Sequence, residues 1–147
     1  MILPDVNVLV YAFRSDMPQH AICRPWLSAV VSGDARFAMS PAVLTTLVRI
    51  TTNPRVYRSP SPISEALAFC DNLLDQPHCQ TVQPGEQHWA IFRHLCVETD
   101  ARGSIVADAW LAALAIESGC EWITFDRDYA RFPGLRWSVP TAAIVKS

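Results

Sequence analysis

Three separate segments of the chain carry aspartates at places where a carboxylate could do chemistry. Asp5 follows a short apolar run, and Asp108 lies near the start of an apolar helical pattern. Asp126 and Asp128 follow a second apolar run. Crowded carboxylates repel one another unless a cation joins them, and hard divalent ions favour oxygen ligands. If the segments meet, we expect them to bind Mg²⁺ or Mn²⁺, because they contain no cysteine or histidine.

Each aspartate also has a structural interpretation. Asp5 could cap a turn, and Asp108 could serve the N-terminus of its helix. Asp126 and Asp128 could shape a turn. Convergence of three segments on one place is harder to explain in this way, and a carboxylate-held metal usually acts on phosphate. The sequence has no G-x-x-x-x-G-K-[ST], G-x-G-x-x-G or G-x-S-x-G motif, so phosphodiester hydrolysis is the favoured chemistry.

Hydrophobic patterning predicts the elements that must position these acids. Short apolar runs predict strands at Met1–Leu3, Arg36–Met39, Trp122–Phe125 and Arg136–Val139. Helical periodicity predicts helices at Ala21–Ser32, Ala42–Thr51, Ser64–Asp75, Glu86–Thr99 and Ile105–Ser118. Pro25 is expected to bend or delay the first helix, and Gly119 to end the last. Alternating strands and helices predict an α/β fold with a central parallel sheet flanked by helices, whose ligands bind beyond the carboxyl ends of the strands.

The composition predicts a single domain spanning residues 1–147. Half of the residues are hydrophobic and 18% are charged, which excludes a disordered chain. The expected connections at Asn53–Pro62 and at residues 76–85 are too short to divide the chain. The apolar stretches are too short to cross a membrane and no secretory leader is recognisable, so we expect a cytoplasmic protein without membrane contact. The five cysteines are scattered, which argues against zinc and favours burial as small hydrophobic side chains.

Four blocks of the sequence occur in an order that is typical of one family. They are a D-x-N-x-L block within Leu3–Ala12, the segment Arg49–Tyr57, a D-A-x-L-A-A helix within Ala107–Ala115, and a closing T-x-D-x-D-F-like block within Ile123–Leu135. Together they resemble the PIN-domain nucleases, in particular the VapC-type toxins of bacterial toxin–antitoxin pairs. The resemblance covers nearly the whole chain. It implies a PIN-like fold, endonucleolytic cleavage of RNA, a small cognate antitoxin that blocks the site, and a homodimer.

The resemblance also assigns roles to single residues. It makes Asp5 and Asp108 the principal metal ligands, with Asp126 a further catalytic acid of the site and Asp128 its companion ligand. The expected ion is Mg²⁺, with Mn²⁺ as the alternative.

Three neutral residues complete the implied site. Asn7 and Thr124 would orient carboxylates by hydrogen bonds. Thr46 stands where many family members carry a glutamate, and threonine reaches a Mg²⁺ ion only through water. Thr46 therefore supports a rival hypothesis, a degenerate PIN domain that binds RNA or a partner protein without cleaving. A phosphatase of the aspartyl-phosphate type ranks last, because Asn7 occupies the position where it would want an acid.

The positive charges of the chain are almost all arginines. The net charge of −2 excludes a strong overall field for nucleic acid, but eleven of the twelve cations are arginines, whose planar fork suits phosphate oxygens. Arg49, Arg55 and Arg58 fall close together in the sequence. They are either ordinary surface charges or contacts to RNA phosphates near the scissile bond or to acidic groups of the antitoxin.

Overall fold

A parallel sheet forms the centre of the molecule in the computed structural model, which describes residues 1–141. Within these residues the strands are β1 (Ile2–Pro4), β2 (Phe37–Met39), β3 (Cys79–Thr81), β4 (Glu121–Ile123) and β5 (Trp137–Ser138). The helices are α1 (Val6–Phe13), α2 (His20–Ser32), α3 (Pro41–Thr51), α4 (Ile63–Leu74), α5 (His88–Thr99), α6 (Ser104–Ser118) and the 3-10 helix η1 (Arg127–Arg131). Residues 142–147 of the expected domain lie outside the described residues.

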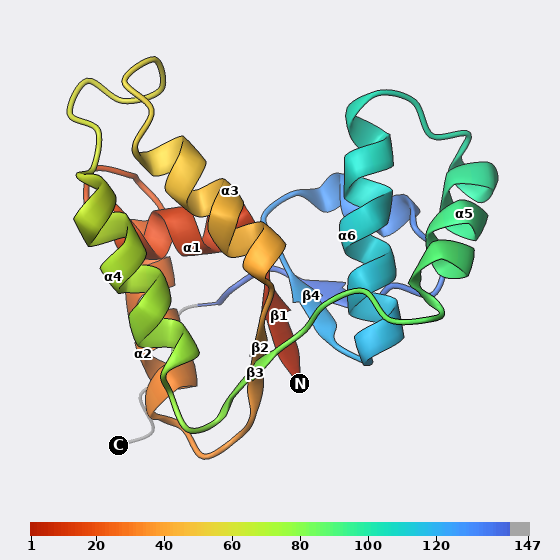
Figure 1. The fold of residues 1–147 in the computed structure, drawn as a ribbon, viewed down its shortest axis with the longest axis horizontal. Coiled ribbons are helices and arrows are strands. Elements are labelled where there is room, and N and C mark those ends of the chain that lie inside the picture. The colour runs from red at the N-terminus through yellow and green to blue at the C-terminus, as the bar shows by residue number, and fades with distance from the viewer. Residues whose placement is uncertain (142–147) are drawn as a thin grey trace.

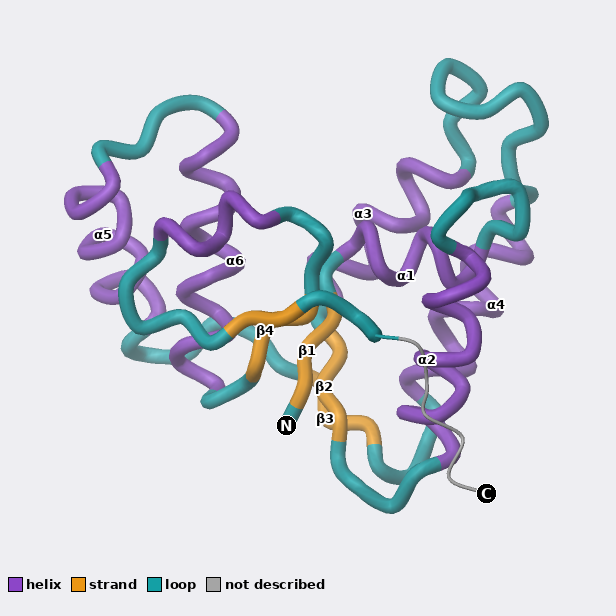
Figure 2. The backbone as a smooth tube through the Cα atoms, turned by 180° about the vertical axis from the view of Figure 1, so that it is seen from behind, coloured by secondary structure: helices purple, strands orange, loops and turns teal. Residues whose placement is uncertain are grey.

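The strand order is β3-β2-β1-β4-β5, and every neighbouring pair is parallel. From β1 the chain moves outwards to β2 and β3, and then returns to add β4 and β5 on the other side of β1. Helices α1 to α4 lie on one side of the sheet, and α5 and α6 lie on the other (Figure 1; seen from behind in Figure 2). The order of strands therefore reverses between β1 and β4, where open α/β sheets form their ligand crevice.

The core fills the space between the sheet and its helices. Leu3, Phe37 and Trp122 are at most 1% exposed, because helices cover both faces of their strands. Helix α6 packs through alanines that are fully buried, Ala109, Ala112, Ala113 and Ala115. It ends at Gly119, whose φ of 69° lies in the left-handed region, as predicted for this position.

Three elements were missed in the sequence: α1, β3 and the 3-10 helix η1. Helix α1 has only eight residues, seven of them apolar, and its three valines are poor helix formers, so it gives a short apolar run without a clear helical signal. Strand β3 lies in the segment that was predicted to be a connection. Its side chains are half-buried or exposed at the edge of the sheet, so they form no apolar run.

Smaller differences concern the boundaries of elements. Helix α2 begins at His20 and includes Pro25, so the predicted delay of its start is wrong. Strand β4 ends at Ile123, which leaves Thr124 and Phe125 beyond the sheet. Cys23, Cys70 and Cys120 are buried as expected, whereas the other two cysteines are half-buried. Among residues 1–141 no helix is long and apolar enough to cross a membrane.

Arg14 holds the loop after α3 against the far end of α1. Its guanidinium donates to both carboxylate oxygens of Asp16 at 2.9 and 2.7 Å, to Ser61 Oγ at 3.0 Å and to the Ser59 carbonyl at 3.0 Å. It also lies over the Tyr57 ring, 3.7 Å from the ring centre. Arg14 is only 9% exposed, so the loop that carries two of the candidate arginines is anchored by a nearly buried cation.

Candidate active site

Asp5 is fixed at the carboxyl end of β1, beside the end of β4. Its backbone N–H donates to the Ile123 carbonyl at 2.8 Å and so extends the pairing of the two strands. Its side chain caps α1, because Oδ1 accepts the Val6 N–H at 2.6 Å. The other oxygen, Oδ2, accepts the Thr124 hydroxyl at 2.7 Å. The carboxylate is 4% exposed, so it is a buried charge at the reversal of strand order.

The two residues that were expected to orient carboxylates both contact this group. Asn7 Nδ2 lies 3.5 Å from Asp5 Oδ2 and 3.3 Å from Thr124 Oγ1. Its Oδ1 accepts the Phe125 N–H at 3.4 Å. Thr124 Oγ1 in turn accepts the Asp126 N–H at 3.0 Å. This network joins the segment after β1 to the segment after β4.

Asp108 reaches the same region from the second turn of α6. It is half-buried, and its Oδ1 accepts the Tyr129 hydroxyl at 3.2 Å. Tyr129 is 3% exposed and packs against the ring of Trp122. Sequence reasoning gave Tyr129 no role. The available signal was that the family block ends in phenylalanine where this chain has tyrosine, which adds a hydroxyl.

The carboxylates of the region influence one another. Burial raises the pKa of Asp5 from its ordinary 3.8 to about 6, and the hydrogen bonds from Thr124 and Val6 oppose that rise. The negative charges of Asp108 and Asp126 raise it further. Among residues 1–141, no ion pair joins an arginine to any of these three aspartates. A cation placed here would relieve both the burial cost and the repulsion.

The electrostatics of Asp108 are milder because it is less buried. Burial raises its pKa, and the charges of Asp126 and Asp128 add to that rise. The hydrogen bond from Tyr129 and the charge of Arg131 lower it. No group of three or more acidic, histidine or cysteine side chains within residues 1–141 encloses a metal position by itself. The chemistry of the donors fits a hard divalent ion, which can take much of its coordination from water.

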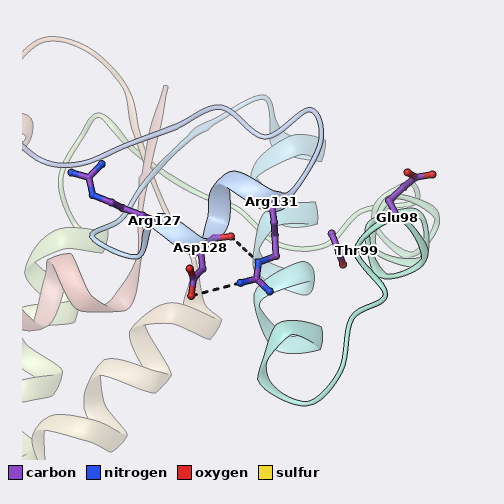
Figure 3. A pocket seen from close by; sticks show the side chains of 5 residues that line it. All are labelled: Glu98, Thr99, Arg127, Asp128 and Arg131. Atoms are coloured by element: carbon purple, nitrogen blue, oxygen red, sulfur yellow. Dashed lines mark hydrogen bonds and ion pairs between the residues drawn. The ribbon is translucent and has the colours of Figure 1, made fainter.

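Asp126 and Asp128 differ in their surroundings. Asp126 is half-buried and caps η1, because its Oδ1 accepts the Asp128 N–H at 2.9 Å. The Asp128 side chain is 74% exposed, and its Oδ2 lies 3.6 Å from an Arg131 nitrogen. It lines a cavity of about 500 Å³ together with Arg127, Arg131 and the end of α5, Glu98 and Thr99 (Figure 3). Asp126 therefore belongs to the Asp5 region, whereas Asp128 is partly neutralised at its margin.

Thr46 lies beside Asp5. Both line a cavity of about 230 Å³ between α3 and α6. Its other lining residues are Val6, Ala42, Val43, Ala107, Trp110 and Leu111. Thr46 Oγ1 donates to the Ala42 carbonyl at 3.0 Å, as threonine commonly does within a helix. The helix position at which many family members carry an acid therefore faces this part of the molecule, but here it brings no charge.

The three candidate arginines lie apart from the carboxylates. Arg49 is near the C-terminal end of α3, and Arg55 and Arg58 are in the following loop; all are exposed. The opposite end of α3 borders the Asp5 cavity, and at 1.5 Å per residue the helix is about 16 Å long. These arginines can meet a ligand that extends along α3, but the structure does not gather them around Asp5.

Comparisons with known proteins agree with this architecture. The model of the PIN domain family matches residues 2–135. Ribonuclease VapC25 of Mycobacterium tuberculosis is 41% identical over 136 residues, which are 92% of this chain and 96% of that protein. Ribonuclease VapC43 of the same organism is also 41% identical, over 140 residues that cover 95% of each protein.

Solved structures share the fold at low sequence identity. A chain of VapBC2 from Rickettsia felis, solved with a DNA fragment from their promoter, has a TM-score of 0.70 and 18% identity and covers 95% of this chain and 99% of that chain. VapC20 of M. tuberculosis, described as a toxin that cleaves the sarcin–ricin loop, has a TM-score of 0.62 and 18% identity and covers 92% and 99%. From the family model and the close sequence relatives it follows that this chain belongs to the PIN-domain family.

Proposed function

We propose that this protein is a metal-dependent endoribonuclease and the toxin component of a type II toxin–antitoxin pair. The observation that carries the proposal is the buried Asp5 carboxylate, whose pKa is raised to about 6 in the field of Asp108 and Asp126. A buried carboxylate that has no ion-pair partner and lies near two further carboxylates is typical of a cation-binding site. The names of the relatives at 41% identity, VapC25 and VapC43, supply the substrate class, which is RNA.

The proposed metal is Mg²⁺, with Mn²⁺ as the alternative. Asp5, Asp108 and Asp126 would hold it, and Asp128 would contribute only weakly from the margin, because Arg131 already pairs with it. When bound, such an ion supplies positive charge opposite the scissile phosphate and lowers the pKa of water. The residues of the chain then have separate tasks.

Those tasks follow from the hydrogen bonds around the carboxylates. Thr124 and Asn7 hold the Asp5 carboxylate towards the end of β4. Tyr129 donates to one oxygen of Asp108 and leaves the other available. Tyr129 is itself held in place by packing against the buried Trp122 ring.

A second candidate function is binding without cleavage. Thr46 favours it, because this position lines the Asp5 cavity and contributes no charge. Mg²⁺ needs few protein carboxylates and keeps several waters, so three aspartates are enough for the catalytic proposal. Metal-dependent cleavage of RNA decides between the two.

The proposal includes partners. A small antitoxin would block the acidic site, and a homodimer would be the form in solution, both in the cytoplasm. VapBC structures are among the fold neighbours, which supports the search for an antitoxin. The exposed Arg49, Arg55 and Arg58 would contact RNA phosphates or acidic groups of that antitoxin.

The test is cleavage of RNA by the purified full chain. We expect new RNA 5′ ends at defined positions with Mg²⁺ or Mn²⁺, none with EDTA, and none with Asp5→Asn in either metal. The same ends should appear in cells when the chain is expressed, together with growth arrest. RNA binding without cleavage in both metals would establish the second candidate and overturn the first.

A further inference from the structure

We propose that the cavity between α3 and α6 is a nucleobase subsite, which receives the base next to the phosphate that is cleaved. This inference rests on the proposed ribonuclease function and adds how the substrate is held. The cavity has a volume of about 230 Å³, below the range of roughly 300–1,000 Å³ that is usual for drug-sized ligands. It therefore suits a single planar ring system better than a whole nucleotide.

The walls of the cavity are those of an aromatic subsite. Helix α3 contributes Ala42 and Val43, and helix α6 contributes Trp110 and Leu111. An indole can stack on the face of any of the four bases, so such a wall favours a base without selecting one. Asp5 would be taken up by the proposed metal, and among residues 1–141 no arginine or lysine lines the cavity to hold a phosphate. A ribose would leave hydroxyls without partners against apolar walls. The base is the part of an RNA chain that these walls fit.

Trp110 is held in place for this role. Its ring contacts the imidazole of His88 edge-on, with 4.8 Å between the ring centres. The His88 side chain is 4% exposed, and its Nε2 is 2.9 Å from the Trp110 carbonyl oxygen. The indole is thus braced from α5 and does not have to be ordered when a ligand arrives, which favours affinity.

The polar edge of the cavity adds a preference. The Thr46 hydroxyl already donates its hydrogen to the Ala42 carbonyl, so it can only accept from a ligand. A base that presents an N–H group to α3 would satisfy it. The glutamate that many family members carry here would put a second charge on this wall, so Thr46 is what makes the wall suitable for a base.

The experiment compares intact RNA with RNA that lacks one base. A short single-stranded RNA with one cleavage site is made with an abasic ribonucleotide on either side of the cut, and kcat/KM is measured for each. For the wild type we expect a loss of roughly tenfold at one of the two positions, as one stacked base contributes. For Trp110→Leu we expect a similar loss on intact RNA and no further loss on the abasic RNA.

Two further variants guard against a folding defect. Ala42→Met fills the cavity from its exposed rim and should behave as Trp110→Leu does. Trp89→Leu removes an indole that is 70% exposed on the neighbouring α5, and it should behave as the wild type does. If the abasic RNA loses as much kcat/KM with Trp110→Leu and Ala42→Met as with the wild type, or if neither abasic position matters to the wild type, the cavity is not a base subsite.

A separate readout distinguishes this inference from the function on which it rests. Fluorescence anisotropy gives the Kd of the same RNAs for Asp108→Asn, which needs no cleavage. A weaker Kd for the abasic RNA, which disappears in the double variant with Trp110→Leu, supports the subsite even if the wild type cleaves nothing. An equal Kd for intact and abasic RNA overturns the subsite while leaving any observed cleavage to stand.

Discussion

Helix α1 begins at a buried carboxylate that has no ion-pair partner among residues 1–141, and it ends at an arginine bound to an aspartate. At the first end, burial raises the pKa of Asp5 to about 6. At the second end, Arg14 lowers the pKa of the exposed Asp16 carboxyl through two hydrogen bonds. The folded chain compensates the charge at one end with an arginine, whereas within residues 1–141 no ion pair compensates the charge at the other end. The difference separates a charge that holds the fold from a charge that, on our proposal, binds a metal ion.

Asp128 shows the same contrast between a compensated and an uncompensated carboxylate. Asp128 is close to Asp126 in sequence but 74% exposed and paired with Arg131, so its charge costs little. The number of aspartates in a motif therefore does not define the site. What defines it is the part of the negative charge that neither water nor an arginine compensates.

The largest effect is expected at Asp108. Asp108→Asn should lower the rate of metal-dependent RNA cleavage by on the order of 10²-fold or more, because an amide cannot replace a charged metal ligand. Circular dichroism should show an intact fold. The matched control is Asp128→Asn, which should stay within about threefold of the wild type, since Asp128 is already paired. Equal rates for both variants would remove the distinction between the two acids.

The next effect is expected at the other end of α1. Arg14→Ala should lower the free energy of unfolding by about 2 kcal/mol, because it removes four hydrogen bonds from a nearly buried guanidinium. Urea unfolding measures this change. Arg24→Ala, on the exposed face of α2, is the control and should change stability by less than about 0.5 kcal/mol. If the two variants are equally stable, the Arg14 cluster does not hold the fold.

A smaller effect is expected from adding a negative charge near Asp5. Thr46→Glu should lower the Mg²⁺ concentration for half-maximal cleavage by roughly tenfold, because it brings a further carboxylate to the wall that Asp5 lines. Thr45→Glu adds the same charge one residue away, outside the lining of this cavity, and should change little. Calorimetric titration with Mg²⁺ provides the direct measure. If both variants change the Mg²⁺ dependence equally, the added carboxylate does not act as a metal ligand from position 46.

The smallest effect is expected at Tyr129. Tyr129→Phe removes one hydrogen bond to Asp108, which contributes about 1 kcal/mol, and should slow cleavage about fivefold. Because the hydroxyl positions a metal ligand, the half-saturating Mg²⁺ concentration should rise as well. Tyr57→Phe, at the Arg14 end, is the matched control for both quantities. A change in unfolding free energy without a change in metal dependence would leave Tyr129 a core residue only.

The positions of the candidate aspartates could be predicted, because they follow from the strands. Asp5 and Asp126 come directly after apolar runs, and parallel strands deliver such residues to one edge. Asp108 was found because its helix neighbours are apolar, so its charge required a partner. The fold class followed from the same alternation of strands and helices.

The remaining features depend on contacts that no local pattern records. Helix α1 is too short and too uniformly apolar to show a helical period, and β3 is an edge strand without an apolar run. The bond from Tyr129 to Asp108 joins residues 21 positions apart. The Asp5 cavity is formed by three segments that meet only in the folded chain. Such features depend on how distant segments pack together, which the spacing of residues along the sequence does not reveal.

The most direct test of the central claim is the stability of the wild type and Asp5→Asn, measured by urea unfolding at pH 4 and pH 8 in EDTA and in Mg²⁺. The unfolded chain releases the Asp5 proton near 3.8, whereas the folded chain keeps it to about 6. The contribution of the Asp5 carboxyl to the free energy of unfolding therefore falls by about 2–3 kcal/mol as the pH rises through this interval. Asp5→Asn lacks this contribution. The asparagine also changes stability in a way that does not depend on pH. This effect cancels when the stability difference between the two proteins at pH 4 is compared with that at pH 8.

In EDTA we predict that Asp5→Asn gains about 2–3 kcal/mol over the wild type between pH 4 and pH 8. Mg²⁺ at pH 8 should stabilise the wild type and leave Asp5→Asn unchanged, because an ion that binds only the folded site shifts the equilibrium towards it. A difference between the two proteins that is independent of pH, or equal stabilisation of both by Mg²⁺, would contradict the assignment of Asp5 as a carboxylate kept for a metal.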